Sequence, residues 1–201
     1  MPDPAKYTVY VGNVKRGAGT VAKVKSVKTR FDIAVLELDR DIVTTYAPLA
    51  ETDPAVNSPA DIFAWGGTCE TGCGLSETMK TARMRVSRVD AGDDGSKMVN
   101  LAQSGDGFAW FGDSGGPAML NGVQFGVLCR GDTSSDGSGE ESYSSVANSL
   151  NWIQLVTGVG GTPPSTPSAN LALNKAAKSA NASCNASEGP AKAVNGTATV
   201  S

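Results

Sequence analysis

The first part of the chain alternates apolar and polar positions over short stretches. Such alternation is typical of half-buried β-strands, whose successive side chains point to opposite faces of a sheet. Polar segments rich in glycine, serine and aspartate separate the stretches. The pattern predicts an all-β domain with these strands: Tyr7–Val11, Thr20–Val27, Ile33–Leu38, Asp61–Trp65, Thr81–Val89, Met98–Ala102 and Val123–Leu128.

A single helix is predicted after the strands, from about Asn148 to Val156. Leu150 and Ile153 recur at helical spacing and share one face with the last residue of this stretch. Gly158 stands where a helix C-cap is expected. We therefore expect a terminal helix that docks on the β domain.

The chain divides into three segments of different composition. Residues 1–157 hold all the predicted strands and the helix. Residues 158–169 are rich in glycine, threonine, serine and proline, and have almost nothing to bury, so they are expected to form a linker. Residues 170–201 begin something new but are too few to close a core of their own, so we expect them to be disordered in this chain.

Composition and charge exclude several classes of function. The 201 residues are 40% hydrophobic and 18% charged, with 24 glycines, which favours an all-β secreted domain over a helical cytosolic one. The net charge of −3 argues against a nucleic-acid partner. No apolar run is long enough to span a membrane, and residues 1–20 show no apolar core of a signal peptide.

The spacing of the four cysteines and the lack of histidine argue against a zinc site. Cys69 and Cys73 are placed to close a small disulfide loop, which leaves the pairing of Cys129 and Cys184 open. The acidic residues of the polar stretch Gly131–Glu141 are expected in a surface loop, where they rarely hold calcium. We expect no metal and no cofactor.

The run Gly-Asp-Ser-Gly-Gly-Pro at residues 112–117 is the most informative motif. A serine hydroxyl becomes a nucleophile only when a base takes its proton, and acyl transfer also needs backbone N–H groups aimed at the developing oxyanion. Gly112 is able to adopt the backbone angles that turn its N–H toward the same point as the N–H of Ser114. Asp113 is suited to lock this turn through an ion pair.

The motif and three other segments, in this order along the chain, resemble the chymotrypsin and trypsin family of serine proteases. The other segments are Phe31–Leu38 (Phe-Asp-Ile-Ala-Val-Leu-Glu-Leu), Ala64–Gly66 (Ala-Trp-Gly) and Tyr143–Val146. The resemblance covers roughly Tyr7 to Val156. It implies a double β-barrel, here with an incomplete first barrel and a C-terminal helix, that hydrolyses peptide bonds of a protein or peptide substrate through an acyl-enzyme.

The resemblance also assigns roles to individual residues. Ser114 is the nucleophile, and Asp32 is the buried carboxylate that orients the base. The backbone N–H groups of Gly112 and Ser114 are the oxyanion donors. Asp113 is the residue that, in active members of the family, pairs with the freed N-terminal ammonium.

The substrate pocket departs from the trypsin-like pattern. Phe108 occupies the position where trypsin-like members have an acid, six residues before the serine. The resemblance places Cys129 and Gly131 at the wall of the pocket. No preference for arginine or lysine is therefore assigned, and an apolar or partly blocked pocket is an equal alternative.

The general base is also missing from the sequence. The family carries it on a histidine that precedes the aspartate, yet only 31 residues precede Asp32 and none of them is histidine. We therefore expect the chain to begin inside the first barrel and to be inactive by itself. The alternative is a secreted, non-catalytic protein that binds peptides, surfaces or carbohydrates on a protease scaffold.

The C-terminal segment resembles the opening of a discoidin module (factor 5/8 type C, galactose-binding-like). The resemblance rests on Asn170–Lys175 and on the run from Cys184 to Gly196. It implies a carbohydrate or surface ligand for the full-length protein. The alternative is a disordered tail with no ligand.

Overall fold

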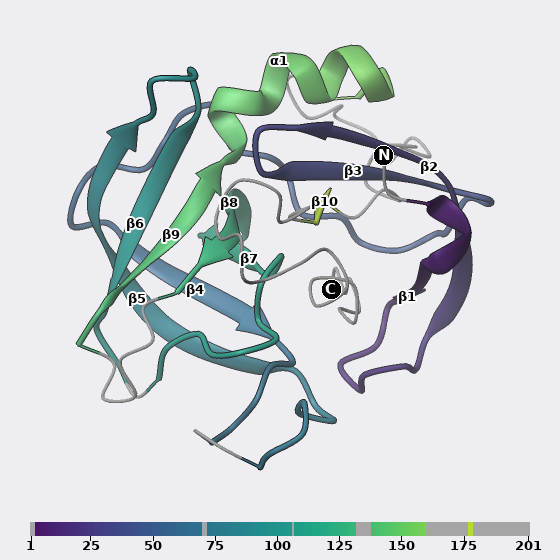
Figure 1. The fold of residues 1–201 in the computed structure, drawn as a ribbon, viewed down its shortest axis with the longest axis horizontal. Coiled ribbons are helices and arrows are strands. Elements are labelled where there is room, and N and C mark those ends of the chain that lie inside the picture. The colour runs from purple at the N-terminus through teal and green to yellow at the C-terminus, as the bar shows by residue number, and fades with distance from the viewer. Residues whose placement is uncertain (1–2, 70–71, 106, 132–137, 160–176, 179–201) are drawn as a thin grey trace.

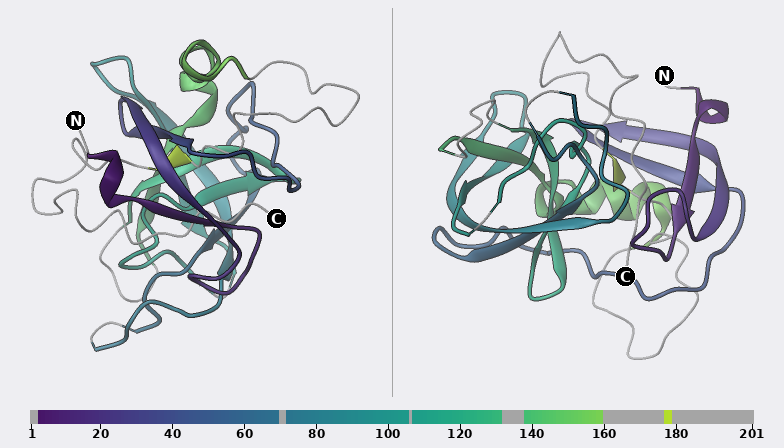
Figure 2. Two further views of the ribbon diagram at one scale, coloured as in Figure 1. Left: turned by 90° about the vertical axis from the view of Figure 1, so that its right-hand side faces the viewer. Right: turned by 90° about the horizontal axis from the view of Figure 1, so that it is seen from below.

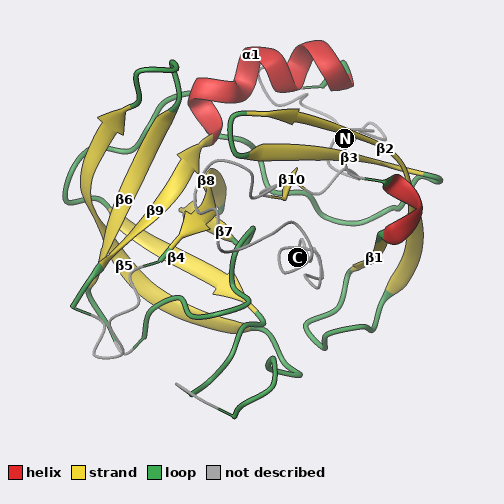
Figure 3. Cartoon of the chain, in the orientation of Figure 1, coloured by secondary structure: helices red, strands yellow, loops and turns green. Residues whose placement is uncertain are grey.

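In the computed structural model, the described residues are 3–69, 72–105, 107–131, 138–159 and 177–178. Their strands form two sheets, one open and one closed into a barrel (Figure 1). Figure 3 shows that helix is limited to α1 (Val146–Thr157) and the short η1 (Pro4–Lys6) among these residues. The predicted all-β fold with a C-terminal helix is confirmed.

The open sheet contains the first strands of the chain, in the antiparallel order β1-β2-β3-β10. Along β2, Ala22, Val24 and Val27 are buried while the lysines between and after them are exposed, as the alternating pattern predicts, and Val21 at the start of the strand is exposed. The strands are β1 (Thr8–Val11), β2 (Thr20–Arg30), β3 (Ile33–Leu38) and β10 (Ala177–Lys178). The remainder of the segment 170–201, including the discoidin-like run, lies outside the described residues.

The second sheet closes on itself in the order β4-β5-β6-β9-β8-β7, and β7 returns to β4 through the pair Ile62 and Ala118. Closure leaves no exposed sheet edge in this barrel. The view from below in Figure 2 separates the barrel from the open sheet. The strands are β4 (Pro59–Ala64), β5 (Lys80–Ala91), β6 (Lys97–Gln103), β7 (Pro117–Leu120), β8 (Val123–Arg130) and β9 (Glu140–Ser145).

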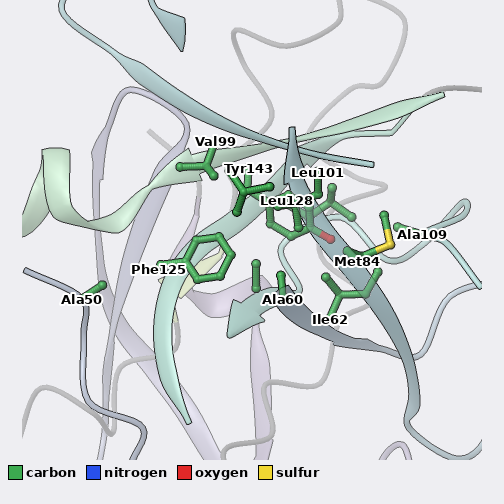
Figure 4. Close-up of a cluster of buried hydrophobic side chains, with 12 residues drawn as sticks. Ala50, Ala60, Ile62, Met84, Val99, Leu101, Ala109, Phe125, Leu128 and Tyr143 are labelled. Carbon is green, nitrogen blue, oxygen red and sulfur yellow. The ribbon is translucent and has the colours of Figure 1, made fainter. Parts of the chain in front are cut away.

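The inside of the barrel is filled by aliphatic and aromatic side chains (Figure 4). Val86, Val99 and Leu101 have no exposed surface, and Phe125 and Tyr143 are 1% exposed. This dense interior fixes the strands whose ends carry the motif of residues 112–117.

Helix α1 begins two residues earlier than predicted, at Val146. Its N-cap is Ser145, whose Oγ accepts a hydrogen bond of 3.0 Å from the N–H of Asn148. Gly158 ends the helix with a φ of 72° and donates its N–H to the carbonyl of Gln154 at 2.7 Å, as the sequence predicted. The helix runs along both sheets in Figure 1.

One predicted loop is partly wrong. The polar stretch Gly131–Glu141 was expected at the surface, but β9 already begins at Glu140 and pairs with both β6 and β8. Glu141 and Ser142 are therefore buried. The strand was hidden from sequence patterning because its buried side chains are polar and satisfied by hydrogen bonds, such as that from Ser142 Oγ to Asn100 Oδ1 at 2.7 Å.

Candidate active site

Ser114 lies on a turn that leads directly into β7. The N–H of Asp113 donates to the carbonyl of Trp110 at 3.0 Å and closes the turn, with Gly112 at a φ of 92°. Only glycine adopts this left-handed conformation without strain. The next residue after the serine, Gly115, donates its N–H to the carbonyl of Leu128 on β8 at 2.9 Å. Barrel strands therefore hold the serine in a defined position.

The N–H groups of the two residues predicted as oxyanion donors have no acceptor among the described residues. Within the part of the chain that the structure describes, no protein acceptor takes a hydrogen bond from the N–H of Gly112 or of Ser114. The hydroxyl of Ser114 likewise makes no hydrogen bond to a described residue, and its side chain is half-buried. Attack on a carbonyl needs such a hydroxyl and such N–H groups, together with a base that takes the proton.

Asp32 is completely buried in the turn between β2 and β3. Its neighbour Ile33 packs in a cluster with Val127 of β8 and Val146 of α1. The N–H of Gly115, which follows Ser114, donates to the carbonyl of Leu128, the residue after Val127 on β8. The residues that follow Asp32 and Ser114 therefore both contact the same stretch of β8.

Asp113 is 4% exposed and is held by several groups. Its Oδ1 accepts from the N–H of Gly66 at 2.5 Å, and its Oδ2 accepts from the N–H of Trp110 at 2.7 Å. The ammonium of Lys80 lies 3.8 Å from Oδ2. Burial raises the pKa of the Asp113 carboxyl, although these donors and the lysine act in the opposite direction.

A cavity of about 500 Å³ opens beside Asp113. Its lining includes Phe108, Lys80 and Tyr143. Of the predicted substrate-pocket residues, only Phe108 lies on this cavity. The others are at the end of β8, where Cys129 is buried and Gly131 is exposed.

Glu141 is a buried acid next to this cavity that sequence reasoning assigned to a surface loop. One carboxylate oxygen accepts from the N–H of Ala109, and the other accepts from the hydroxyl of Tyr143 at 3.1 Å. Burial is the main reason that the pKa of Glu141 rises to about 6. The period of two in a strand was the available signal, since it puts residues 141 and 143 on one face.

Cys69 and Cys73 form a disulfide, as their spacing suggested, and none of the described cysteines is free. Cys184 lies outside the described residues.

No helix in the described ranges is both long and apolar enough to cross a membrane.

A closed six-stranded barrel beside a second β-sheet, with one C-terminal helix, is the fold of the chymotrypsin-like serine proteases. Residues 3–153 match the family model described as Trypsin. The chain belongs to the trypsin family.

Two curated relatives are similar in sequence. Brachyurin from Leptuca pugilator is 27% identical over 140 residues, which cover 64% of this chain and 61% of the relative. Trypsin iota from Drosophila melanogaster is 28% identical over 138 residues, which cover 61% of this chain and 53% of the relative. The chain thus spans between about half and three fifths of the length of these relatives.

Solved structures with the same fold are more distant in sequence. Human heparin binding protein superposes with a TM-score of 0.58 at 20% identity, over 73% of this chain and 70% of that one. Neuropsin from mouse brain gives 0.60 at 18% identity, over 68% and 72%. An inactivated protease paralogue of the scabies mite gives 0.61 at 17% identity, over 78% of both chains.

Proposed function

We propose that the chain is the nucleophile-bearing part of a serine endopeptidase that cleaves protein or peptide substrates. The single observation that carries the proposal is the turn around Ser114. It combines a half-buried hydroxyl with two neighbouring backbone N–H groups that make no hydrogen bond to a described residue, in a member of the trypsin family.

In the proposed reaction, Ser114 Oγ attacks the scissile carbonyl while a base takes its proton. The N–H groups of Gly112 and Ser114 stabilise the oxyanion, and the amine leaves after it receives the proton from the base. Water then hydrolyses the acyl-enzyme by the same route. Asp32 orients the base and stabilises its protonated form.

The proposed reaction needs a base that the given sequence does not supply as a histidine. By itself the chain is therefore expected to keep the hydroxyl of Ser114 protonated and to be inactive, with a rate lower by several orders of magnitude. No cofactor takes part in the proposed chemistry. The disulfide between Cys69 and Cys73 supports an extracellular location, because such bonds persist in oxidising compartments.

A second candidate function is non-catalytic binding of peptides, surfaces or carbohydrates. The absence of histidine from the sequence favours it. Two of the structurally similar proteins are named as a heparin binding protein and an inactivated protease paralogue. The discoidin-like segment of residues 170–201 would contribute a carbohydrate or surface ligand in the full-length protein.

Labelling with a fluorophosphonate separates the two functions, because the probe reacts only with an activated serine. We expect no label on the given chain, and label at Ser114 once the chain is extended by its in-frame upstream coding sequence. The extended Ser114→Ala variant should lose the label. A folded, extended protein that contains a histidine before Asp32 but takes up no label would favour the binding function, whereas strong labelling of the given chain would refute the need for the missing base.

A further inference from the structure

Asp113 immediately precedes the proposed nucleophile, and its carboxylate is paired with a lysine of the same barrel. We infer that Lys80 is a positioning residue: its ammonium is the built-in cation that holds Asp113, and thereby the turn at residues 110–115, in place. The turn then needs no ammonium released by cleavage of the chain. The inference concerns the regulation of the proposed protease and rests on that proposed function for its meaning, but the pairing is measurable without any catalysis.

The position of Lys80 is fixed by the barrel. It is the first residue of β5, and it pairs with Ala64 in the ladder between β4 and β5. Its ammonium donates a hydrogen bond of 3.0 Å to the carbonyl of Gly67. The same group lies 3.8 Å from Asp113 Oδ2. Two anchors, one on the backbone and one on the carboxylate, thus hold the ammonium beside the turn.

The environment of the pair is mostly protected from solvent. The side chain of Asp113 is 4% exposed and that of Lys80 is 32% exposed. A carboxylate that leaves water loses its hydration, and a nearby cation offsets much of this loss. Burial raises the pKa of Asp113, and the charge of Lys80 lowers it. The lysine therefore favours the ionised form that accepts hydrogen bonds on both oxygens.

Those hydrogen bonds connect the pair to the proposed site. Asp113 Oδ2 accepts from the N–H of Trp110, and the carbonyl of Trp110 accepts from the N–H of Asp113. The two bonds close the loop that contains Gly112. On the other side, Asp113 Oδ1 accepts from Gly66, which follows β4. Loss of the ionised carboxylate would loosen both ends of the turn together.

The backbone of Gly66 approaches the carboxylate very closely. A Cβ at this position would lie 2.3 Å from Asp113 Oδ1, so a larger residue does not fit without moving the acid. Asp113 thus has the backbone of Gly66 packed against one oxygen and the ammonium of Lys80 near the other, an arrangement that suits an ionised carboxylate. Lys80, Asp113, Gly66 and Trp110 all belong to the described part of the chain.

The test compares amide hydrogen exchange in folded variants of the given chain by NMR. The reporters are the N–H groups of Gly66, Trp110 and Asp113, which all depend on the carboxylate. In Lys80→Met, which keeps the aliphatic stem and removes the charge, we expect protection at these amides to fall by about tenfold or more. The N–H of Gly158, which is bonded to Gln154, reports on the helix and should be unchanged.

Two variants serve as controls, and a third repeats the loss of charge. Lys80→Arg retains a cation and should keep most of the protection. Lys97→Met removes a lysine that pairs with Asp53 at 3.3 Å in the same barrel, and it should leave the three reporters unchanged. Lys80→Gln retains a donor for the carbonyl of Gly67 without the charge, so it should resemble Lys80→Met. It also provides the measurement if the methionine variant does not fold.

Rescue by a small cation makes the test specific for charge. In Lys80→Ala, added butylammonium should restore protection at the three amides, and butanol should not. The inference would be overturned if protection in both Lys80→Met and Lys80→Gln stays within about twofold of the wild-type value. The inference would also be overturned if the dipeptide Ile-Val increases protection in the wild type. Its free N-terminal ammonium would then supply a cation that Lys80 does not provide.

The outcomes are distinguishable from a failure of the proposed function. If the exchange results are as expected but the extended protein takes up no fluorophosphonate, Lys80 holds the turn in a protein that is not a protease. If labelling succeeds while Lys80→Met leaves the amides protected, the protease function stands and the role of Lys80 is refuted.

Discussion

The indole Nε1 of Trp65 donates a hydrogen bond of 2.8 Å to the carbonyl of Val14. Trp65 follows β4 of the barrel, whereas Val14 follows β1 of the open sheet. The next residue, Gly66, is bonded to Asp113. The dipeptide Trp65-Gly66 is therefore bonded both to the segment that follows β1 and to the turn that carries Ser114.

Replacement of Trp65 by phenylalanine should cost about 0.5–1.5 kcal/mol of unfolding free energy, because the carbonyl of Val14 loses one of its two donors and keeps the N–H of Met79 at 2.8 Å. Urea denaturation at neutral pH measures the change. Trp110→Phe is the matched control, since its indole bond to the carbonyl of Cys69 is exposed to water. If both variants lose the same unfolding free energy, the hydrogen bond from Trp65 to Val14 stabilises the protein no more than the exposed bond from Trp110.

Glu141 should make the stability of the protein depend on pH. Burial raises its pKa from 4.5 to about 6, so the folded state binds the proton more tightly than the unfolded chain. The resulting stabilisation is complete below pH 4.5 and is lost as the pH rises through about 6. A shift of this size corresponds to about 2 kcal/mol.

Glu141→Gln should remove this pH dependence and raise the unfolding free energy at pH 7.5 by up to about 2 kcal/mol, because the amide resembles the protonated acid. The neighbouring Glu140→Gln changes a partly exposed acid that pairs with Arg88, and it should preserve the dependence. Urea titrations between pH 4 and 8 give both values. An unchanged slope in Glu141→Gln would assign the dependence to other groups.

Gly66→Ala should destabilise the protein by about 1–3 kcal/mol, since its Cβ would overlap the carboxylate of Asp113. Gly74→Ala is the matched control: it lies in the same connection between β4 and β5, and nothing lies within 4 Å of its Cβ position. Thermal unfolding compares the two variants. A neutral effect of Gly66→Ala would mean that the turn has room to shift, contrary to a tightly built site.

Leu101→Ala tests the interior of the barrel. Leu101 has no exposed surface, and its truncation should cost about 2–5 kcal/mol through lost burial and a residual cavity. Leu155 on α1 is 83% exposed, so Leu155→Ala should change stability by less than about 0.5 kcal/mol. Urea denaturation distinguishes a closed, packed barrel from a loose sheet, in which the two costs would be similar.

Sequence patterning predicted the apolar strands and the terminal helix because alternation and helical spacing reflect which side chains are buried. It also singled out Ser114 and Asp32 through motifs. It missed the buried role of Glu141 because β9 buries polar side chains that satisfy one another. It missed Lys80 because its pairing with Asp113 joins the start of β5 to a turn 33 residues later in the sequence, which local patterns do not report.

The pairing of Ile62 with Ala118, which closes the barrel, also affects the order in which parts of the fold form. The neighbouring pairs of β4, β5 and β6 are local hairpins, which form early, whereas closure joins residues far apart along the chain and is intrinsically slow. The turn with Ser114 directly precedes the closing strand. We therefore expect its geometry to be among the last features to form during folding, so that any trapped intermediate with an open barrel would lack a competent nucleophile.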